Sequence, residues 1–63
     1  MSTALYTDLG VKLKAAREAC ELTQAKVAQY LGIARELISY YENGTRHIDL
    51  LTLNKLSNLY GFP

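Results

Sequence analysis

The sequence has few of the residues that cross-link small proteins or bind metals. Cys20 is the one cysteine and His47 the one histidine, and the 63 residues include no tryptophan and a single proline. No disulfide can form within the chain, and neither a zinc site nor a Cys–His pair has enough ligands. Because the first residues also show no signal-peptide pattern, we expect a cytoplasmic protein.

An excess of one charge and long apolar runs are also missing. Seven basic residues stand against six acidic ones, a net charge of +1, which does not indicate a strongly basic nucleic-acid binder. No run approaches the ~20 apolar residues of a membrane span. Without a Ser-His-Asp arrangement, a phosphate-binding glycine loop or clustered metal ligands, we expect no enzymatic activity, no cofactor and no metal, and no small-molecule ligand is evident.

Apolar residues are plentiful and recur every three or four positions. They make up 49% of the sequence, enough for a packed core. The spacing predicts four helices: one that begins after Thr7, one over residues 24–31, one over 35–42, and one that follows Asp49. We therefore predict an all-α fold, a compact bundle of four helices forming a single domain over residues 1–63.

Capping residues mark most of the predicted helix ends. Thr7, Thr23 and Asp49 are expected to cap the first, second and fourth helices, and Gly32 to end the second in a left-handed conformation. On the first helix the apolar stripe contains Leu9, Leu13, Ala16 and Cys20, so Cys20 is expected to fill the core. Leu53, Leu56, Ser57 and Tyr60 form the stripe of the fourth helix, with Leu50 beside it.

The region 24–43 has the spacing of a helix-turn-helix. Two helices that meet at a sharp angle need a small residue at their contact, which is Ala28. They need a glycine where the backbone turns with positive φ, which is Gly32, and a branched apolar residue on the second helix, which is Ile38. This pattern predicts that the second helix of the pair enters the major groove of DNA.

The predicted helix 35–42 has one apolar and one polar face. At 100° per residue, Leu37, Ile38 and Tyr41 point inward. The opposite face carries Glu36, Ser39, Tyr40 and Asn43, with Arg35 at its flank. Four of these side chains can read base edges: Arg35, Glu36, Ser39 and Tyr40. A solvated helix face is the alternative, but such a face more often carries paired long charged residues.

Candidate phosphate contacts surround this helix. Gln24 stands at the start of the second helix, where free backbone N–H groups also attract anions. Asn43, Thr45 and Arg46 follow the predicted helix 35–42, which is called the reading helix below. Lys26 is a weaker candidate for a phosphate contact. Such contacts set the register on DNA and carry no sequence information. We expect His47 to be a loop residue.

Arg17 and Glu42 suggest a structural role. Arg17 lies beside the apolar stripe of the first helix, and Glu42 lies at the end of the reading helix, away from its polar face. We expect a partly buried ion pair that joins these two helices.

The segments TQAKVAQYLG (23–32) and RELISYYENG (35–44) resemble the Cro/C1-type (XRE) helix-turn-helix family, and the similarity extends from about Leu13 to Gly61. This resemblance implies a lambda-repressor-like domain of a bacterial or phage transcriptional regulator, expected to be a repressor that binds a palindromic operator as a homodimer. It also implies the same base-reading and phosphate-contacting residues and the same ion pair as above.

The chain departs from the family in two places. Members commonly have Ser or Thr where Ala34 stands, so the third helix is expected to lack its N-cap. The family's fifth helix is absent or truncated, which suggests the N-terminal part of a longer regulator. The run around Arg35–Glu42 is also similar to regulators linked with a zinc metallopeptidase.

A second class of function remains open. The chain could be a helical protein-interaction module, such as an antitoxin or adaptor, possibly with a metallopeptidase partner. Tyrosine is enriched at such interfaces, and the apolar candidates for this surface are Leu5, Tyr6, Tyr30, Tyr60 and Phe62. Core or rim packing is the other interpretation of these residues.

Overall fold

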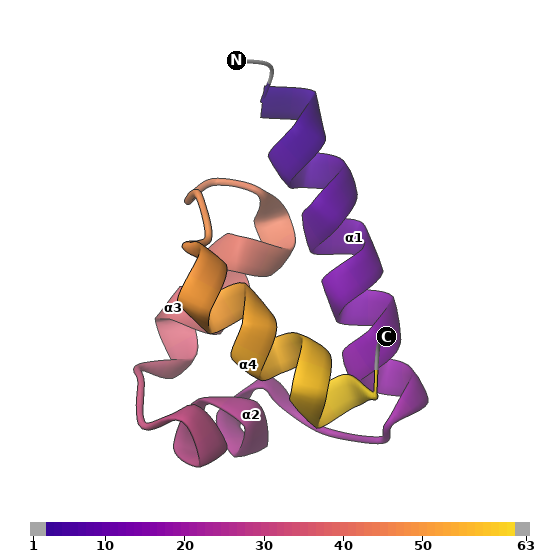
Figure 1. Ribbon diagram of the computed structural model, residues 1–63, viewed down its shortest axis with the longest axis vertical. Coiled ribbons are helices and arrows are strands. Elements are labelled where there is room, and N and C mark those ends of the chain that lie inside the picture. Colours follow the sequence, from indigo (N-terminus) through magenta and orange to yellow (C-terminus); the bar gives the residue numbers. More distant parts are fainter. Residues whose placement is uncertain (1–2, 62–63) are drawn as a thin grey trace.

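The computed structural model describes residues 3–61, and the side chains from Ala4 onward. Four α-helices follow one another, with no strand among the described residues: α1 (Thr3–Ala19), α2 (Gln24–Leu31), α3 (Arg35–Asn43) and α4 (Leu50–Tyr60). The all-α prediction is confirmed. Figure 1 shows α2 and α3 on one side of the long α1, with α4 in front of the opening between them. Phe62 and Pro63 lie outside the described residues.

The beginning of α1 differs from the prediction. The helix starts at Thr3, so Thr7 lies within it and is not its N-cap. Tertiary contacts explain the difference, because the added turn packs on the loop after α3. The Tyr6 and His47 rings stack there, with centroids 3.8 Å apart. In Figure 1 the first half of α1 stands beside that loop.

The predicted caps of α2 and α4 are confirmed. The Thr23 hydroxyl accepts a hydrogen bond from the Lys26 backbone N–H at 3.1 Å, and the Asp49 carboxylate accepts one from Thr52 at 3.0 Å. Gly32 has φ of 71°, the left-handed conformation that ends α2 and that most side chains disfavour. These local bonds satisfy backbone donors that a helix leaves free at its start.

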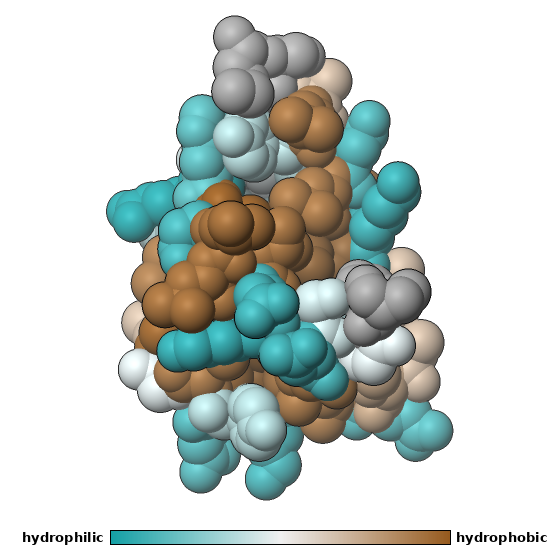
Figure 2. All heavy atoms as spheres, viewed as in Figure 1, coloured by the Kyte–Doolittle hydropathy of each residue, from teal (hydrophilic) through white to brown (hydrophobic). Residues whose placement is uncertain are grey.

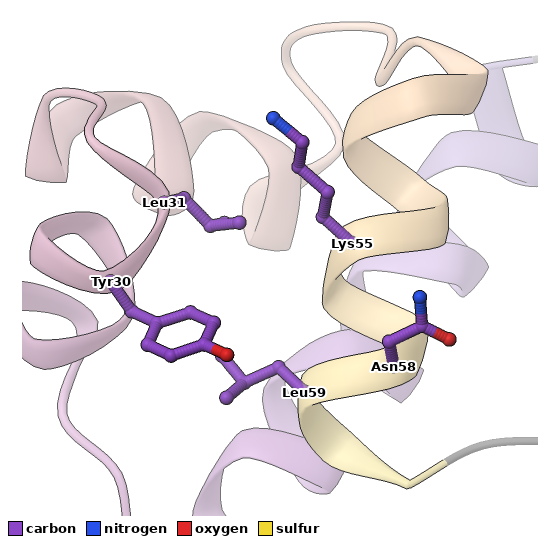
Figure 3. A pocket seen from close by; sticks show the side chains of 5 residues that line it. All are labelled: Tyr30, Leu31, Lys55, Asn58 and Leu59. Carbon is purple, nitrogen blue, oxygen red and sulfur yellow. The ribbon is translucent and has the colours of Figure 1, made fainter.

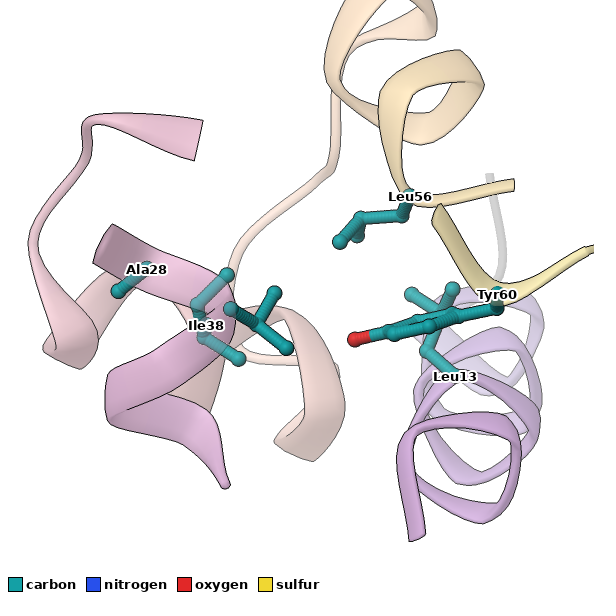
Figure 4. Packing of buried hydrophobic residues seen from close by; sticks show 6 residues of the cluster. Leu13, Ala28, Ile38, Leu56 and Tyr60 are labelled. Carbon is teal, nitrogen blue, oxygen red and sulfur yellow. The ribbon is translucent and has the colours of Figure 1, made fainter. Parts of the chain in front are cut away.

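The core lies where the four helices converge. Its buried apolar members are Leu13, Val27, Ala28, Ile38, Leu56 and Tyr60. Figure 4 shows that the cluster draws side chains from all four helices. Ala28 and Ile38 are both buried, as the helix-turn-helix spacing predicted. The small side chain of Ala28 and the branched side chain of Ile38 therefore pack between α2 and α3.

The prediction for Cys20 is wrong. Cys20 is exposed, and its Sγ lies 3.7 Å from the Tyr60 carbonyl oxygen. α1 ends at Ala19, and Glu21 adopts a left-handed conformation with φ of 58°. The Cys20 backbone N–H still donates to the Ala16 carbonyl oxygen at 3.1 Å, so Cys20 lies at the exposed end of α1, where Glu21 turns the chain. Leu50, in the first turn of α4, is also exposed.

Gly10 allows α1 and α3 to approach closely, which the sequence pattern did not indicate. It is buried in the middle of α1. A Cβ at this position would overlap the Glu42 carbonyl oxygen and lie 2.6 Å from that of Tyr41. Because only glycine fits, the backbone of α1 sets the position of the C-terminal end of α3.

Candidate nucleic-acid interface

The polar face of α3 points away from the core. Arg35 and Glu36 are exposed, Tyr40 is 40% exposed, and Ser39 is partly exposed. On the opposite side Ile38 is buried. The four predicted base-reading side chains therefore lie together on the accessible side of one helix. A rigid helix with this face can place guanidinium, carboxylate, hydroxyl and phenol groups against base edges.

The start of α3 lacks a side-chain cap, as predicted. Ala34 has extended backbone and makes no side-chain hydrogen bond to the first turn. Backbone N–H groups at this end are left without that partner. Glu36 in the first turn interacts favourably with the positive end of the helix dipole.

The loop after α3 brings two predicted phosphate contacts beside the reading helix. Thr45 and Arg46 are exposed, as is Asn43 at the end of α3. The Thr45 hydroxyl donates to the Tyr40 carbonyl oxygen at 3.3 Å, and the Arg46 guanidinium carbon lies 5.2 Å from the centroid of the Tyr40 ring. Arg46 is thus within cation–π range of a predicted base reader.

Arg17 and Glu42 form a buried ion pair between α1 and α3. Arg17 Nε donates to Glu42 Oε2 at 2.7 Å and Nη2 donates to Oε1 at 3.1 Å, while Nη1 donates to the Leu22 carbonyl oxygen at 2.8 Å. Their side chains are 10% and 3% exposed. The hydrogen bond to Glu42 raises the pKa of Arg17, against the opposing effect of desolvation.

Gln24 connects this ion pair to Arg35 on the polar face of α3. Its Nε2 donates to Glu42 Oε1 at 3.0 Å, and its Oε1 accepts from Arg35 Nη1 at 3.1 Å. Its second amide hydrogen is not used in these bonds. The sequence pattern placed Gln24 at the start of α2 but gave no sign of these bonds, because they depend on how α2 and α3 cross. Lys26, the weaker candidate, is exposed.

A cleft between α2 and α4 lies away from this face. Tyr30 and Leu31 of α2 face Lys55, Asn58 and Leu59 of α4 across an open space of about 410 Å³ (Figure 3). None of the predicted base-reading or phosphate-contacting residues lines it. Within residues 3–61 no cluster of His, Cys, Asp and Glu is placed to hold a metal ion, and no helix is long and apolar enough to cross a membrane.

A hydrophobic area is exposed around α4. Leu50 and Leu51, in its first turn, are 81% and 64% exposed. Figure 2 shows hydrophobic side chains gathered around the first half of α4 and the neighbouring half of α1. Exposed apolar surface of this kind is typical of sites that contact another protein.

Comparison with known families matches residues 13–63 to the family described as Helix-turn-helix. Two curated relatives come from Bacillus subtilis (strain 168). The HTH-type transcriptional regulator ImmR is 46% identical over 52 residues, and the SPbeta prophage-derived uncharacterized HTH-type transcriptional regulator YonR is 42% identical over 52 residues. Each match covers 82% of this chain, but only 41% of ImmR and 48% of YonR, so the chain spans less than half of either relative.

Among solved structures, the DNA-binding domain of BldD is similar throughout. The two chains superpose with a TM-score of 0.86 at 29% sequence identity, and the match covers 100% of this chain and 92% of that one. The similarity therefore includes α1 and α4 as well as the helix pair at the centre.

Proposed function

Since this chain belongs to the helix-turn-helix family, we propose that it is the DNA-binding part of a transcriptional regulator and reads the major groove with α3. The observation that carries the proposal is the exposed row of Arg35, Glu36, Ser39 and Tyr40, with Arg46 beside it. The regulators ImmR and YonR and the DNA-binding domain of BldD support it through their similarity.

Each proposed base-reading side chain would make a different kind of hydrogen bond to the bases. Arg35 would donate to guanine O6 and N7, and Glu36 would accept from the cytosine amino group. Ser39 and Tyr40 can donate or accept, so their preference depends on the neighbouring base. These groups act in the groove without a catalytic step, and the protein would act in the cytoplasm, where its DNA is.

Phosphate contacts would hold the helix in register. Arg46 and Thr45 lie in the loop at one end of α3, Asn43 is at its last turn, and the spare amide hydrogen of Gln24 lies at the start of α2. Contacts at both ends would fix the angle at which α3 enters the groove.

We also propose that two copies bind a palindromic operator and repress transcription. One domain of this size contacts too little DNA for tight specific binding, whereas a dimer doubles the contacts. The exposed Leu50 and Leu51 supply apolar surface for a second copy. Occupancy of an operator excludes other proteins from that DNA, which by itself is enough for repression.

The same exposed leucines favour a second candidate, a protein-interaction module. In that case the partner would be a different protein, and α3 would have no role in binding it. Substitution of Leu50 and Leu51 would abolish partner binding, while substitution of Arg35 would leave it intact.

The test is selection of bound sequences from a random DNA pool, followed by fluorescence-anisotropy titrations at several salt concentrations. We expect a two-fold symmetric site and an affinity that falls steeply with salt. Arg35→Ala should cost about 1–3 kcal/mol and relax preference at one position, whereas Arg46→Ala should weaken all sequences alike and flatten the salt dependence. Salt-insensitive binding, or the same behaviour for both variants, would refute the assignment.

A further inference from the structure

Tyr6 of α1 contacts His47 in the loop after α3. Its ring stacks on that of His47, with an interplanar angle of 10°. Tyr6 belongs to the turn of α1 that sequence reasoning missed, and His47 directly follows Arg46, a proposed phosphate contact. The stack therefore joins the N-terminal part of α1 to the loop that carries Arg46.

A second contact joins the same two segments. Gly44 lies so close to α1 that a Cβ there would be 2.7 Å from both the Cα and the backbone N of Thr7. Gly44 also has a φ of 75°, a left-handed conformation that glycine adopts more easily than other residues. Gly44, the first residue of the loop, therefore packs on the α1 backbone, and His47, three residues later, stacks on Tyr6.

Thr45 of the same loop is hydrogen-bonded to α3. The Tyr40 carbonyl oxygen accepts from the Thr45 backbone N–H at 3.0 Å and from its hydroxyl at 3.3 Å. Arg46 then lies over the Tyr40 ring. Arg46 is thus flanked on one side by a residue bonded to α3 and on the other by a residue stacked on α1.

We propose that Tyr6 is a positioning residue for DNA binding, which holds Arg46 in place for a phosphate through its stack on His47. This inference rests on the proposed function of α3 and its loop. Binding a phosphate orders both the backbone of the loop and the arginine side chain, and the backbone part of this entropy cost is smaller when the loop is already fixed. Tyr6 need not touch DNA itself.

The test measures binding to the selected operator and to random-sequence DNA for Tyr6→Ala, Tyr6→Phe and Tyr30→Ala. Tyr6→Ala is expected to weaken binding to both DNAs by about 3- to 10-fold, the range for loss of one aromatic contact, with base preference unchanged. Tyr6→Phe keeps the ring and should bind within about 2-fold of the unmodified protein. Tyr30→Ala is the matched control, because this exposed tyrosine lines the α2–α4 cleft.

A double-substitution cycle separates positioning from general stability. If Tyr6 acts through Arg46, then Tyr6→Ala should have little further effect in an Arg46→Ala background. His47→Ala removes the other half of the stack and should reproduce the Tyr6→Ala loss. The NMR signals of the His47 ring report the stack directly, since ring-current shifts should disappear in Tyr6→Ala and persist in Tyr6→Phe. Binding is measured at a temperature at which circular dichroism shows every variant to be folded, so that a loss of affinity does not reflect unfolding.

Three results would overturn the inference: unchanged affinity in Tyr6→Ala after the His47 signals have moved, a full additional loss in the Arg46→Ala background, or an altered base preference. All three presuppose that the unmodified protein binds DNA. Absence of salt-sensitive DNA binding by the unmodified protein would instead refute the proposed function itself.

Discussion

Replacing Arg17 by methionine should leave a buried carboxylate without its partner. Glu42 is 3% exposed and receives two hydrogen bonds from Arg17, so the substitution would leave it with Gln24 as its remaining side-chain donor. Methionine retains most of the bulk but neither the charge nor the donors. The Leu22 carbonyl oxygen also loses its bond to Arg17.

Breaking a buried ion pair on one side costs about 3–5 kcal/mol. A domain of 63 residues has a stability of roughly 3–9 kcal/mol at 0.05–0.15 kcal/mol per residue. Arg17→Met should therefore remove a large part of the free energy of unfolding and leave a measurable unfolded fraction. Urea titration followed by circular dichroism at helix wavelengths measures this directly, since the chain has no tryptophan.

The double substitution Arg17→Met with Glu42→Leu provides the control. Removing both charges avoids the desolvated carboxylate, so this protein should recover to within about 1–2 kcal/mol of the original. A loss below ~0.5 kcal/mol in Arg17→Met would mean that the pair behaves as an exposed one. A double variant no more stable than the single one would show that packing, and not the unpaired charge, explains the loss.

Three other predictions concern the fold. Gly10→Ala should destabilise the protein by about 1–3 kcal/mol or more, because its Cβ would overlap the Glu42 carbonyl oxygen; urea titration measures the loss. Burial raises the pKa of Tyr60 to about 12 from 10.0, so its contribution to stability should be present below pH 10 and be lost as pH rises through about 12. Tyr60→Phe should flatten that part of the stability–pH profile. Ala34→Ser should add the missing N-cap and stabilise the protein by about 0.5–1 kcal/mol, seen as a higher urea midpoint.

The predicted parts of the site follow from local rules. Thr23 and Gly32 delimit α2 because capping and positive φ depend on a few neighbouring residues. Helical periodicity separated Ile38 from Arg35 and Tyr40 for a similar reason. The pairing of Arg17 with Glu42 was expected from their positions on the two helices, the family resemblance implied the same pair, and the structure supplied its distances.

Long-range contacts explain the failures. Tyr6 and Thr7 lie in a helix because the loop at Gly44 and His47 packs on that turn, which no local pattern signals. Cys20 continues the apolar stripe in the sequence, but it lies at the end of α1, where the turn at Glu21 leaves it exposed. Gly10 is an ordinary helix interior glycine until α3 is placed against it.

The amino-acid order alone determined the helix pair at 24–43 and its two faces, because caps, turns and helical periodicity act over a few residues. Only the tertiary structure decided where α1 begins, how closely it meets α3 at Gly10, and that Gln24 links Glu42 to Arg35. Those features depend on the crossing of helices whose residues are far apart in the chain, and the energy of such contacts exists only once the chain has folded.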